Sequence, residues 1–146
     1  MIPIVFPEYD FKIKQEEGRS FIFDLVRKKY VILSPEEWVR QHILHYLVGA
    51  MQYPRGLISV EKEIIVNRLR KRYDIVVFSP DRKPWMLVEC KEPAVAISDQ
   101  TLKQLLRYHQ TLQCPFWMLS NGHEHYCAQI RDAGPKWLAA LPSYDL

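Results

Sequence analysis

Cysteine is scarce in this chain of 146 residues, and its scarcity excludes several classes of protein. The three cysteines, Cys90, Cys114 and Cys127, are widely spaced and odd in number, which argues against a disulfide framework and a four-cysteine zinc site. Glycine is also scarce, at five residues, and no glycine-rich phosphate-binding loop is present. No apolar run reaches the ~20 residues that span a bilayer, and acidic residues interrupt the N-terminal segment where a signal peptide needs an apolar core. We therefore expect a cytoplasmic protein with no membrane association.

The remaining composition is typical of an ordinary globular domain. Hydrophobic residues make up 48% of the chain and charged residues 25%. A chain of this length buries roughly 70% of its unfolded surface, so we expect one domain over residues 1–146. The net charge is only +3, but basic residues cluster in "RKK" at 27–29, "RLRKR" at 68–72 and "DRK" at 81–83. Such clusters either bind phosphates or form solvated turns, and the sequence leaves both open.

The hydrophobic pattern predicts a β-hairpin followed by a helix in the first third of the chain. Alternating and apolar segments within residues 10–33 flank a polar turn, as in a hairpin. A helix is predicted from Ser34 to about Met51, because Pro35 suits the first helical position and Glu37 completes a capping box with Ser34.

Strands and a second helix are predicted in the rest of the chain. We expect strands over 57–67, 73–78 and 85–91, a helix over 99–112, and two strands over 115–120 and 125–130, joined by a turn at Asn-Gly 121–122. The basic stretch at 68–72 is expected to be a tight connection, and the tail from 131 is expected to pack on the body. The prediction is a mixed α/β fold, with a central β-sheet flanked by helices and an N-terminal β-hairpin.

Charged residues occur where the predicted strands otherwise look built for burial. Asp74 begins one strand, and Glu89 and Lys91 end the next, with fourteen residues between Asp74 and Glu89. In a hairpin these ends meet, with Glu89 and Lys91 on one face and Cys90 on the other. Two neighbouring carboxylates repel each other unless a cation lies between them, and oxygen ligands suit Mg²⁺ or Mn²⁺. The Cys90 backbone carbonyl would be a third ligand. An ordinary ion-pair cluster at the sheet edge would explain the same spacing.

The pattern Asp74…Glu89-x-Lys91 between two helices resembles the PD-(D/E)xK nuclease superfamily. The segments "VEKEIIVNRLRKRYDIVVF", "LVECKEP", "QLLRY" and "LSNGHEHY" make the chain similar to the type I restriction enzyme R-subunit N-terminal-like family, over roughly residues 20–130. The resemblance implies a restriction-endonuclease-like αβββαβ core at 34–130, after a hairpin extension at 1–33 and before a tail at 131–146. Tyr73 replaces the proline of the superfamily's name, and the sequence contains no motor domain.

The resemblance also implies roles for residues on the two predicted helices. Many such nucleases add a glutamate from the first helix to the metal site, and Glu37 is the best match, with Glu36 next. Its position in the capping box is the alternative explanation for Glu37. Gln104 and Tyr108 match a Gln-x-x-x-Tyr element that contacts the catalytic lysine and the DNA backbone. Four residues form about one helical turn, so the two side chains share a face.

The resemblance implies a Mg²⁺-dependent (or Mn²⁺-dependent) nuclease acting on DNA. Asp74, Glu89, Lys91, Glu37 and Gln104 would be catalytic. Flanking phosphates would be bound by Tyr108 and by the basic side chains Arg68, Arg70, Lys71 and Arg72. The alternative is a non-catalytic module that keeps the fold and binds nucleic acid or protein. Homodimerisation and separate motor or methylase subunits remain open at this point.

Overall fold

A computed structural model of the chain describes residues 1–66, 68–110 and 112–146. Within these residues the chain forms two α-helices, a short 3₁₀ turn and nine β-strands. In chain order they are β1 (Ile13–Glu16), β2 (Arg19–Asp24), β3 (Lys29–Ile32), α1 (Pro35–Gly49), the 3₁₀ turn (Arg55–Leu57), β4 (Ile58–Val66), β5 (Leu69–Phe78), β6 (Pro84–Cys90), α2 (Asp99–Gln110), β7 (Phe116–Ser120), β8 (His125–Gln129) and β9 (Lys136–Trp137).

The strands make two sheets. A small antiparallel sheet has the order β1-β2-β3, and a larger sheet has the order β4-β5-β6-β7-β8-β9. Only the β6–β7 pair is parallel within the described part of the chain. Two neighbouring parallel strands need a crossover connection, and α2 supplies it. The mixed sheet expected from the sequence is therefore confirmed.

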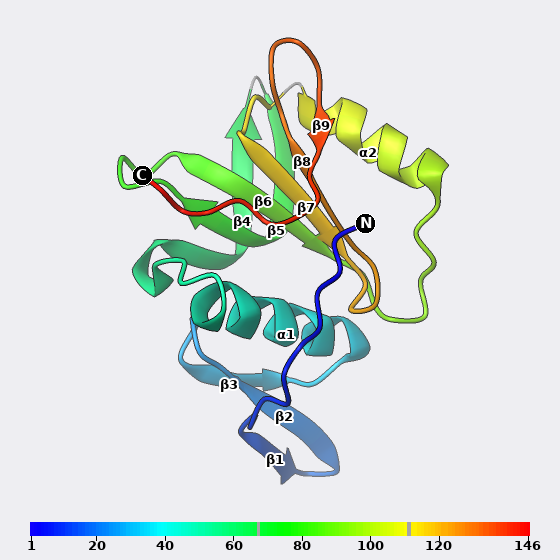
Figure 1. Cartoon of the computed structure of the whole chain (residues 1–146). Coiled ribbons are helices and arrows are strands. Elements are labelled where there is room, and N and C mark those ends of the chain that lie inside the picture. Colours follow the sequence, from blue (N-terminus) through cyan, green and yellow to red (C-terminus); the bar gives the residue numbers. More distant parts are fainter. Residues whose placement is uncertain (67, 111) are drawn as a thin grey trace.

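Helix α1 lies between the two sheets, and α2 lies on the opposite side of the larger one (Figure 1). Val39, Ile43 and Leu47 of α1 belong to one buried hydrophobic cluster with strand residues such as Ile75 and Val88. A second cluster joins α2 to the other face of the larger sheet, through Leu102, Leu106, Tyr73, Leu87 and Trp117. Each face of the sheet is thus covered by one helix. The central strands β5 and β6 are therefore packed on both faces.

The predicted start of α1 is confirmed. Ser34 is the N-cap, and its hydroxyl oxygen accepts a hydrogen bond from the Glu37 backbone N–H at 3.0 Å, satisfying an otherwise unpaired donor. The predicted turn at Asn121 also forms, since its side-chain oxygen accepts from the backbone N–H groups of His123 and Glu124 at 2.9 and 2.7 Å. Gly122 in this turn has a φ of 91°, a value that favours glycine.

Two parts of the prediction were incomplete and one was wrong. The predicted N-terminal hairpin is present but gains a third strand, β3, and the tail packs on the body as predicted but also contributes β9 to the larger sheet. The basic stretch predicted as a tight connection mostly belongs to β5, which begins at Leu69 and pairs with the end of β4. Only Arg68 of this stretch lies in the turn, where its φ is 67°. Long cationic side chains hid the strand because no apolar/polar alternation can be read where three consecutive residues, 70–72, are all charged.

Candidate active site

Asp74 lies where the pairing of β5 with β6 stops. The last pair toward this end is Ile75, one residue after Asp74, with Val88. Its side chain continues the contact, because Asp74 Oδ2 accepts a hydrogen bond from the Cys90 backbone N–H at 2.7 Å. The structure thus brings Asp74 against the backbone of the segment that carries Glu89 and Lys91, as hairpin geometry predicts. The predicted meeting of the Asp74 and Glu89 carboxylates is wrong, because Glu89 projects to the other face of the sheet, toward His109 of α2.

The Cys90 side chain packs on the α1 side of the sheet. It is 3% exposed and belongs to the hydrophobic cluster beneath α1. Burial raises the pKa of the thiol, and the negative charge of Asp74 raises it further. Cys90 is therefore a packing residue with an unreactive thiol.

Arg40 of α1 holds the free oxygen of Asp74. Its Nη2 lies 2.9 Å from Asp74 Oδ1 and 3.3 Å from Glu36 Oε1. Its Nη1 lies 2.6 Å from Glu37 Oε1 and 3.7 Å from Glu61 Oε1. The Arg40 side chain is only 7% exposed, so it is a buried cation surrounded by four carboxylates. This arrangement is favourable only as a unit, since each charge alone would be costly to bury.

The Glu37 carboxylate is held by further hydrogen-bond donors besides Arg40. Besides Arg40, its carboxylate accepts hydrogen bonds from Arg27 Nη2 at 2.8 Å and from Gln41 Nε2 at 3.0 Å. Arg27 and Gln41 are in turn held by the fully buried Asp24. The capping explanation of Glu37 therefore covers only its backbone, and its side chain links the small sheet to the site.

Glu36 lies closer to the predicted catalytic residues than Glu37 does. Burial raises its pKa, and the nearby charge of Asp74 raises it further, while Arg40 and Lys91 act in the opposite direction. Two carboxylates at such close range are the arrangement that a shared cation relieves. Glu36 is thus the helix glutamate that the structure places beside both Asp74 and Lys91.

Glu89 points to the other side of the sheet, toward α2. Its Oε2 accepts hydrogen bonds from Trp117 Nε1 at 2.9 Å and from His109 Nε2 at 3.1 Å, and its Oε1 pairs with the Lys71 ammonium. Burial alone would raise the pKa of Glu89, but the hydrogen bonds from His109 and Lys71 outweigh it and lower the pKa to about 2. Glu89 is therefore ionised throughout the physiological range.

His109 links Glu89 to β5. Burial lowers the pKa of the imidazole, so it is neutral at pH 7 despite the adjacent carboxylate. A neutral ring that donates from Nε2 must accept at Nδ1, and the Tyr73 hydroxyl lies 2.8 Å from that atom. Tyr73, His109 and Glu89 thus form one buried hydrogen-bonded chain.

Three other predicted site residues make fewer contacts with this centre: Lys91, Gln104 and Tyr108. Lys91 is exposed, and it forms no ion pair within the described residues, although its charge influences Glu36. Gln104 is exposed, and no hydrogen bond joins it to Lys91 in the described part of the chain. The Tyr108 ring lies 5.1 Å from Lys71 Nζ and packs edge-on against His109. Tyr108 is therefore beside Glu89, while Gln104 is not joined to the site.

The basic stretch divides into two kinds of side chain. Arg70 and Arg72 are each 68% exposed and pair loosely, at 3.4 Å, with Glu63 and Glu61. Lys71, between them in sequence, turns inward to Glu89. Of the other basic clusters, Arg27 is also turned inward, so it is a structural cation.

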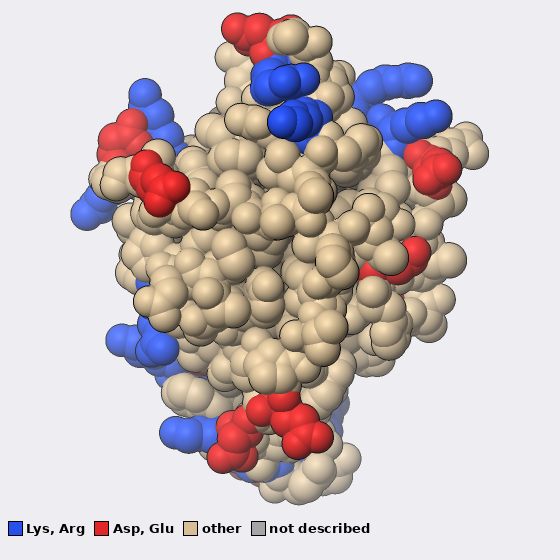
Figure 2. Space-filling view, viewed as in Figure 1, with Lys and Arg blue, Asp and Glu red and all other residues tan. Residues whose placement is uncertain are grey.

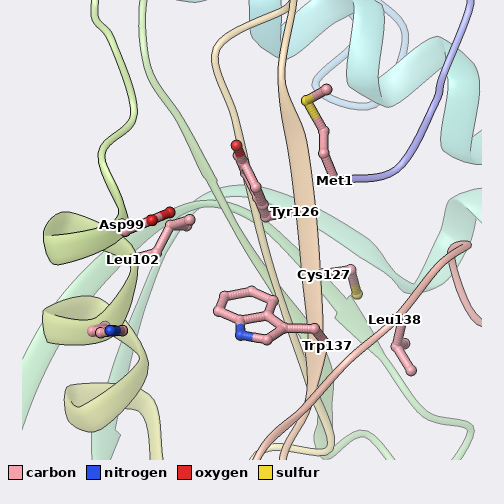
Figure 3. Close-up of a pocket in the computed structure, with 8 residues that line it drawn as sticks. Met1, Asp99, Leu102, Tyr126, Cys127, Trp137 and Leu138 are labelled. Atoms are coloured by element: carbon pink, nitrogen blue, oxygen red, sulfur yellow. The ribbon is translucent and has the colours of Figure 1, made fainter.

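Figure 2 shows one face of the molecule, on which the Lys and Arg side chains lie near the margins and the centre is uncharged. That face offers no continuous basic surface to a phosphate backbone. It includes a cavity of about 310 Å³ between α2 and strands β8 and β9 (Figure 3). The cavity is lined by Met1, Asp99, Leu102, Lys103, Tyr126, Cys127, Trp137 and Leu138, none of which belongs to the charged centre.

The sequence matches the family of the type I restriction enzyme R protein N terminus over residues 35–142, most of the chain. The chain belongs to this family. Its match includes α1, Asp74, Glu89, Lys91 and α2, so the restriction-endonuclease-like fold and a nuclease-related role follow from membership.

Other comparisons add little to the family match. A DUF820 protein from Anabaena variabilis, of known structure, is similar with a TM-score of 0.49 and 10% identity, over 91% of this chain and 79% of that chain. No curated protein matches the sequence. None of the helices in the described residues is long and apolar enough to cross a membrane.

The acids fit the divalent cation that this family implies only in part, because Asp74 lies on the α1 face of the sheet and Glu89 on the α2 face. In the described residues, no three acidic, histidine or cysteine side chains converge as a preformed metal cage. Each acid also has a basic partner: Arg40 for Asp74 and Lys71 for Glu89. A metal ion would therefore have to displace these cations before it reached the carboxylates.

Sequence reasoning missed three side chains that organise the site. Arg40 lies three and four residues after Glu37 and Glu36, a spacing that could have identified it as their partner on one helix face. His109 and Trp117 lie within the predicted helix at 99–112 and the predicted strand at 115–120, but no sequence pattern assigned either of them a role in the site. Their contacts with Glu89 join residues 20 and 28 positions apart, and no local pattern signals such pairs.

Proposed function

We propose that this chain is a divalent-metal-dependent nuclease that hydrolyses DNA phosphodiester bonds. The observation that supports this proposal most is the hydrogen bond from the Cys90 N–H to Asp74. It sets the first family acid directly against the Glu89-x-Lys91 segment. Membership of a restriction enzyme family makes DNA the expected substrate.

Asp74, Glu89 and the Cys90 backbone carbonyl would hold Mg²⁺ or Mn²⁺, and for this the Glu89 side chain would have to turn from Trp117 and His109 toward Asp74. When bound, the ion would supply a Lewis acid for the phosphate and lower the pKa of water at the site. Lys91, exposed and unpaired among the described side chains, would orient the attacking water and stabilise developing negative charge. Glu36 would assist Lys91 as a hydrogen-bond acceptor, with Glu37 holding Arg40 behind it. Gln104 would have to approach when substrate binds.

The exposed cations of β5 would bind the DNA backbone beside the site. Arg70 and Arg72 project from the strand that carries Asp74, and Arg68 lies in the turn before it. Their acidic partners are exposed and loosely held, so exchange for phosphate costs little. Homodimerisation would place two such centres on a duplex, and the family suggests that separate motor or methylase subunits complete a restriction complex.

A specific observation favours a second function, which is DNA or protein binding without turnover. Each of the two central acids already has a basic partner, Arg40 for Asp74 and Lys71 for Glu89, so neither carboxylate is free for a metal ion. A non-catalytic module retaining the nuclease fold would show this arrangement.

Calorimetric titration with Mn²⁺ separates the two functions. The nuclease proposal predicts that the wild-type protein binds the ion and that Asp74→Asn abolishes binding. The matched control Asp81→Asn, in an exposed turn, should leave binding unchanged. DNA binding that needs no metal, together with an absence of metal binding, would instead support the non-catalytic module.

A further inference from the structure

The small sheet β1-β2-β3 has an inner face toward α1 and an outer face away from it. Asp24 of β2 accepts a hydrogen bond from Gln41 of α1, so it marks the inner face, and both Asp24 and Ile22 are fully buried. Successive side chains of a strand point to opposite faces, so Phe21 and Phe23 belong to the outer face. In Figure 1 this sheet forms one end of the molecule, with α1 on one side of it.

Three aromatic rings lie together on the outer face. Tyr30 of β3 pairs directly with Phe23, and their ring centres are 5.3 Å apart in an edge-to-face arrangement. Phe21 stands directly opposite Ile32. Tyr30 is 38% exposed and Ile32 is 53% exposed, so solvent reaches this face. Exposed apolar side chains that gather on one face, rather than lying scattered, indicate a binding surface.

Two lysines from the first strand and the residue before it lie over these rings. Lys14 Nζ is 4.4 Å from the centre of the Tyr30 ring and 5.9 Å from that of the Phe21 ring. Lys12 Nζ is 5.4 Å from the centre of the Phe23 ring. Both lysines are exposed, so the ring faces beneath them open toward solvent. Each ring therefore has an ammonium group close to its accessible face.

Positive charge exceeds negative charge on this surface. On the outer face of the described residues 12–32, Lys12, Lys14 and Arg19 accompany one acid of β1, Glu16, which stands directly opposite Arg19. Glu16 pairs with Lys14 at 3.2 Å, but the two side chains are 61% and 45% exposed. Such an exposed pair contributes little free energy, so an anion from solvent can replace Glu16 at small cost. The surface is therefore complementary to a negatively charged partner.

Rings and ammonium groups side by side fit a single nucleic-acid strand. Proteins bind such strands by stacking the unpaired bases on aromatic rings while cations hold the phosphates. The bases of a duplex are already stacked on one another and present only their edges in the grooves, so they cannot stack on these rings. The six residues of β2 span about 20 Å, enough for about two or three bases on a sheet surface.

We propose that the outer face of β1-β2-β3 binds single-stranded DNA, with bases stacked on Phe21, Phe23 and Tyr30 and phosphates held by Lys12 and Lys14. The sheet precedes residues 35–142, which match the family, so family membership does not assign this surface a role. The choice of DNA rests on the proposed function, but the surface needs no metal.

The first test is the affinity for a labelled deoxythymidine strand of about 15 nucleotides, measured by fluorescence anisotropy in EDTA. Tyr30→Leu keeps an apolar side chain but removes the ring, and it should weaken binding by at least about fivefold, the lower end of the range for one stacked base. The matched control is Trp137→Leu, which removes a ring that is 44% exposed on β9 of the larger sheet. It should leave the affinity unchanged.

The second test separates stacking from phosphate contacts through the salt dependence of the same binding. Lys14→Met should reduce the slope of log affinity against log salt by about 0.7, the value for one phosphate contact with a single strand. Tyr30→Leu should weaken binding without changing the slope, because stacking releases no counterion. The control Lys136→Met, which removes an exposed lysine of β9, should change neither quantity.

The outcomes distinguish this inference from the proposed nuclease. Absence of binding, or binding that neither Tyr30→Leu nor Lys14→Met alters, would overturn the inference. A duplex or an RNA strand of equal length bound as tightly as the DNA strand would also overturn it. So would a dimer, seen by sedimentation velocity, that Tyr30→Leu dissociates, because a second copy would then cover the face.

The two proposals can fail separately. All binding measurements are made in EDTA, so a protein that neither binds Mn²⁺ nor cuts DNA would refute the nuclease and leave this inference standing. Thermal unfolding of each variant verifies that a change in binding does not reflect loss of the fold.

Discussion

The buried guanidinium of Arg40 offers the sharpest test of the charge network around Asp74. Replacing it by methionine keeps an unbranched apolar stem of similar length but removes the cation shared by Glu36, Glu37, Glu61 and Asp74. The carboxylates would then face one another without their common partner.

The expected loss of stability depends on which partners each acid keeps after Arg40 is replaced. Loss of one member of a buried ion pair destabilises a protein by about 3–5 kcal/mol. The lower part of this range applies, because Glu37 keeps Arg27 and Gln41 and because Glu36 is 49% exposed. The Arg40 Nε, buried without a hydrogen-bond partner, is also removed, which offsets part of the loss. We expect a net loss of about 2–3 kcal/mol, or a fall in Tm of about 5–10 °C for a domain of this size.

Urea unfolding at pH 7 measures this loss, with Arg70→Met as the control. Arg70 makes one exposed pair with Glu63 at 3.4 Å, so its replacement should cost less than about 0.5 kcal/mol. Combining Arg40→Met with Glu37→Gln should cost less than the sum of the two single changes, since both remove the same contact. An Arg40→Met variant as stable as the control would refute the reasoning.

Three other predictions concern the surroundings of the site. Burial lowers the pKa of His125 from 6.5 to about 4, so unfolding takes up a proton between these values. Wild-type stability should fall by up to about 3 kcal/mol as the pH drops through this window, whereas His125→Gln should lack that component when urea titrations at each pH are compared. Trp117→Phe removes the indole donor to Glu89 and should cost at least about 2 kcal/mol in thermal unfolding; a loss near zero would show that the bond is not formed. Gly122→Ala should destabilise more than Gly18→Ala in the same assay, because both have positive φ but only at Gly122 would a Cβ meet an α1 side chain, at 3.2 Å; equal effects would argue against that contact.

The elements that carry local signals were predictable from the sequence. Ser34 with Pro35 identifies the start of α1, and Asn121 with Gly122 identifies the β7–β8 turn, because capping and turn formation depend on neighbouring residues alone. The meeting of Asp74 with the Glu89–Lys91 segment also followed from hairpin geometry.

What escaped prediction depends on contacts between distant residues. Glu37 was predicted to be either a metal-site glutamate or a capping residue, yet its carboxylate is committed to Arg27, ten residues earlier. Lys71 was grouped with its basic neighbours, although the strand alternation that turns it toward Glu89 was hidden by the charges on both sides. Such pairings arise from tertiary packing, which composition and periodicity do not encode.

Cleavage of DNA tests the central claim most directly. Supercoiled plasmid and single-stranded DNA would be incubated with Mg²⁺ or Mn²⁺, with wild-type protein beside Lys91→Met, whose exposed side chain can be replaced without disturbing the core. The account predicts cleavage by the wild type that EDTA blocks and that Lys91→Met lacks while it still binds DNA. A folded wild-type protein that cuts neither substrate with either metal, or a Lys91→Met variant as active as the wild type, would contradict it.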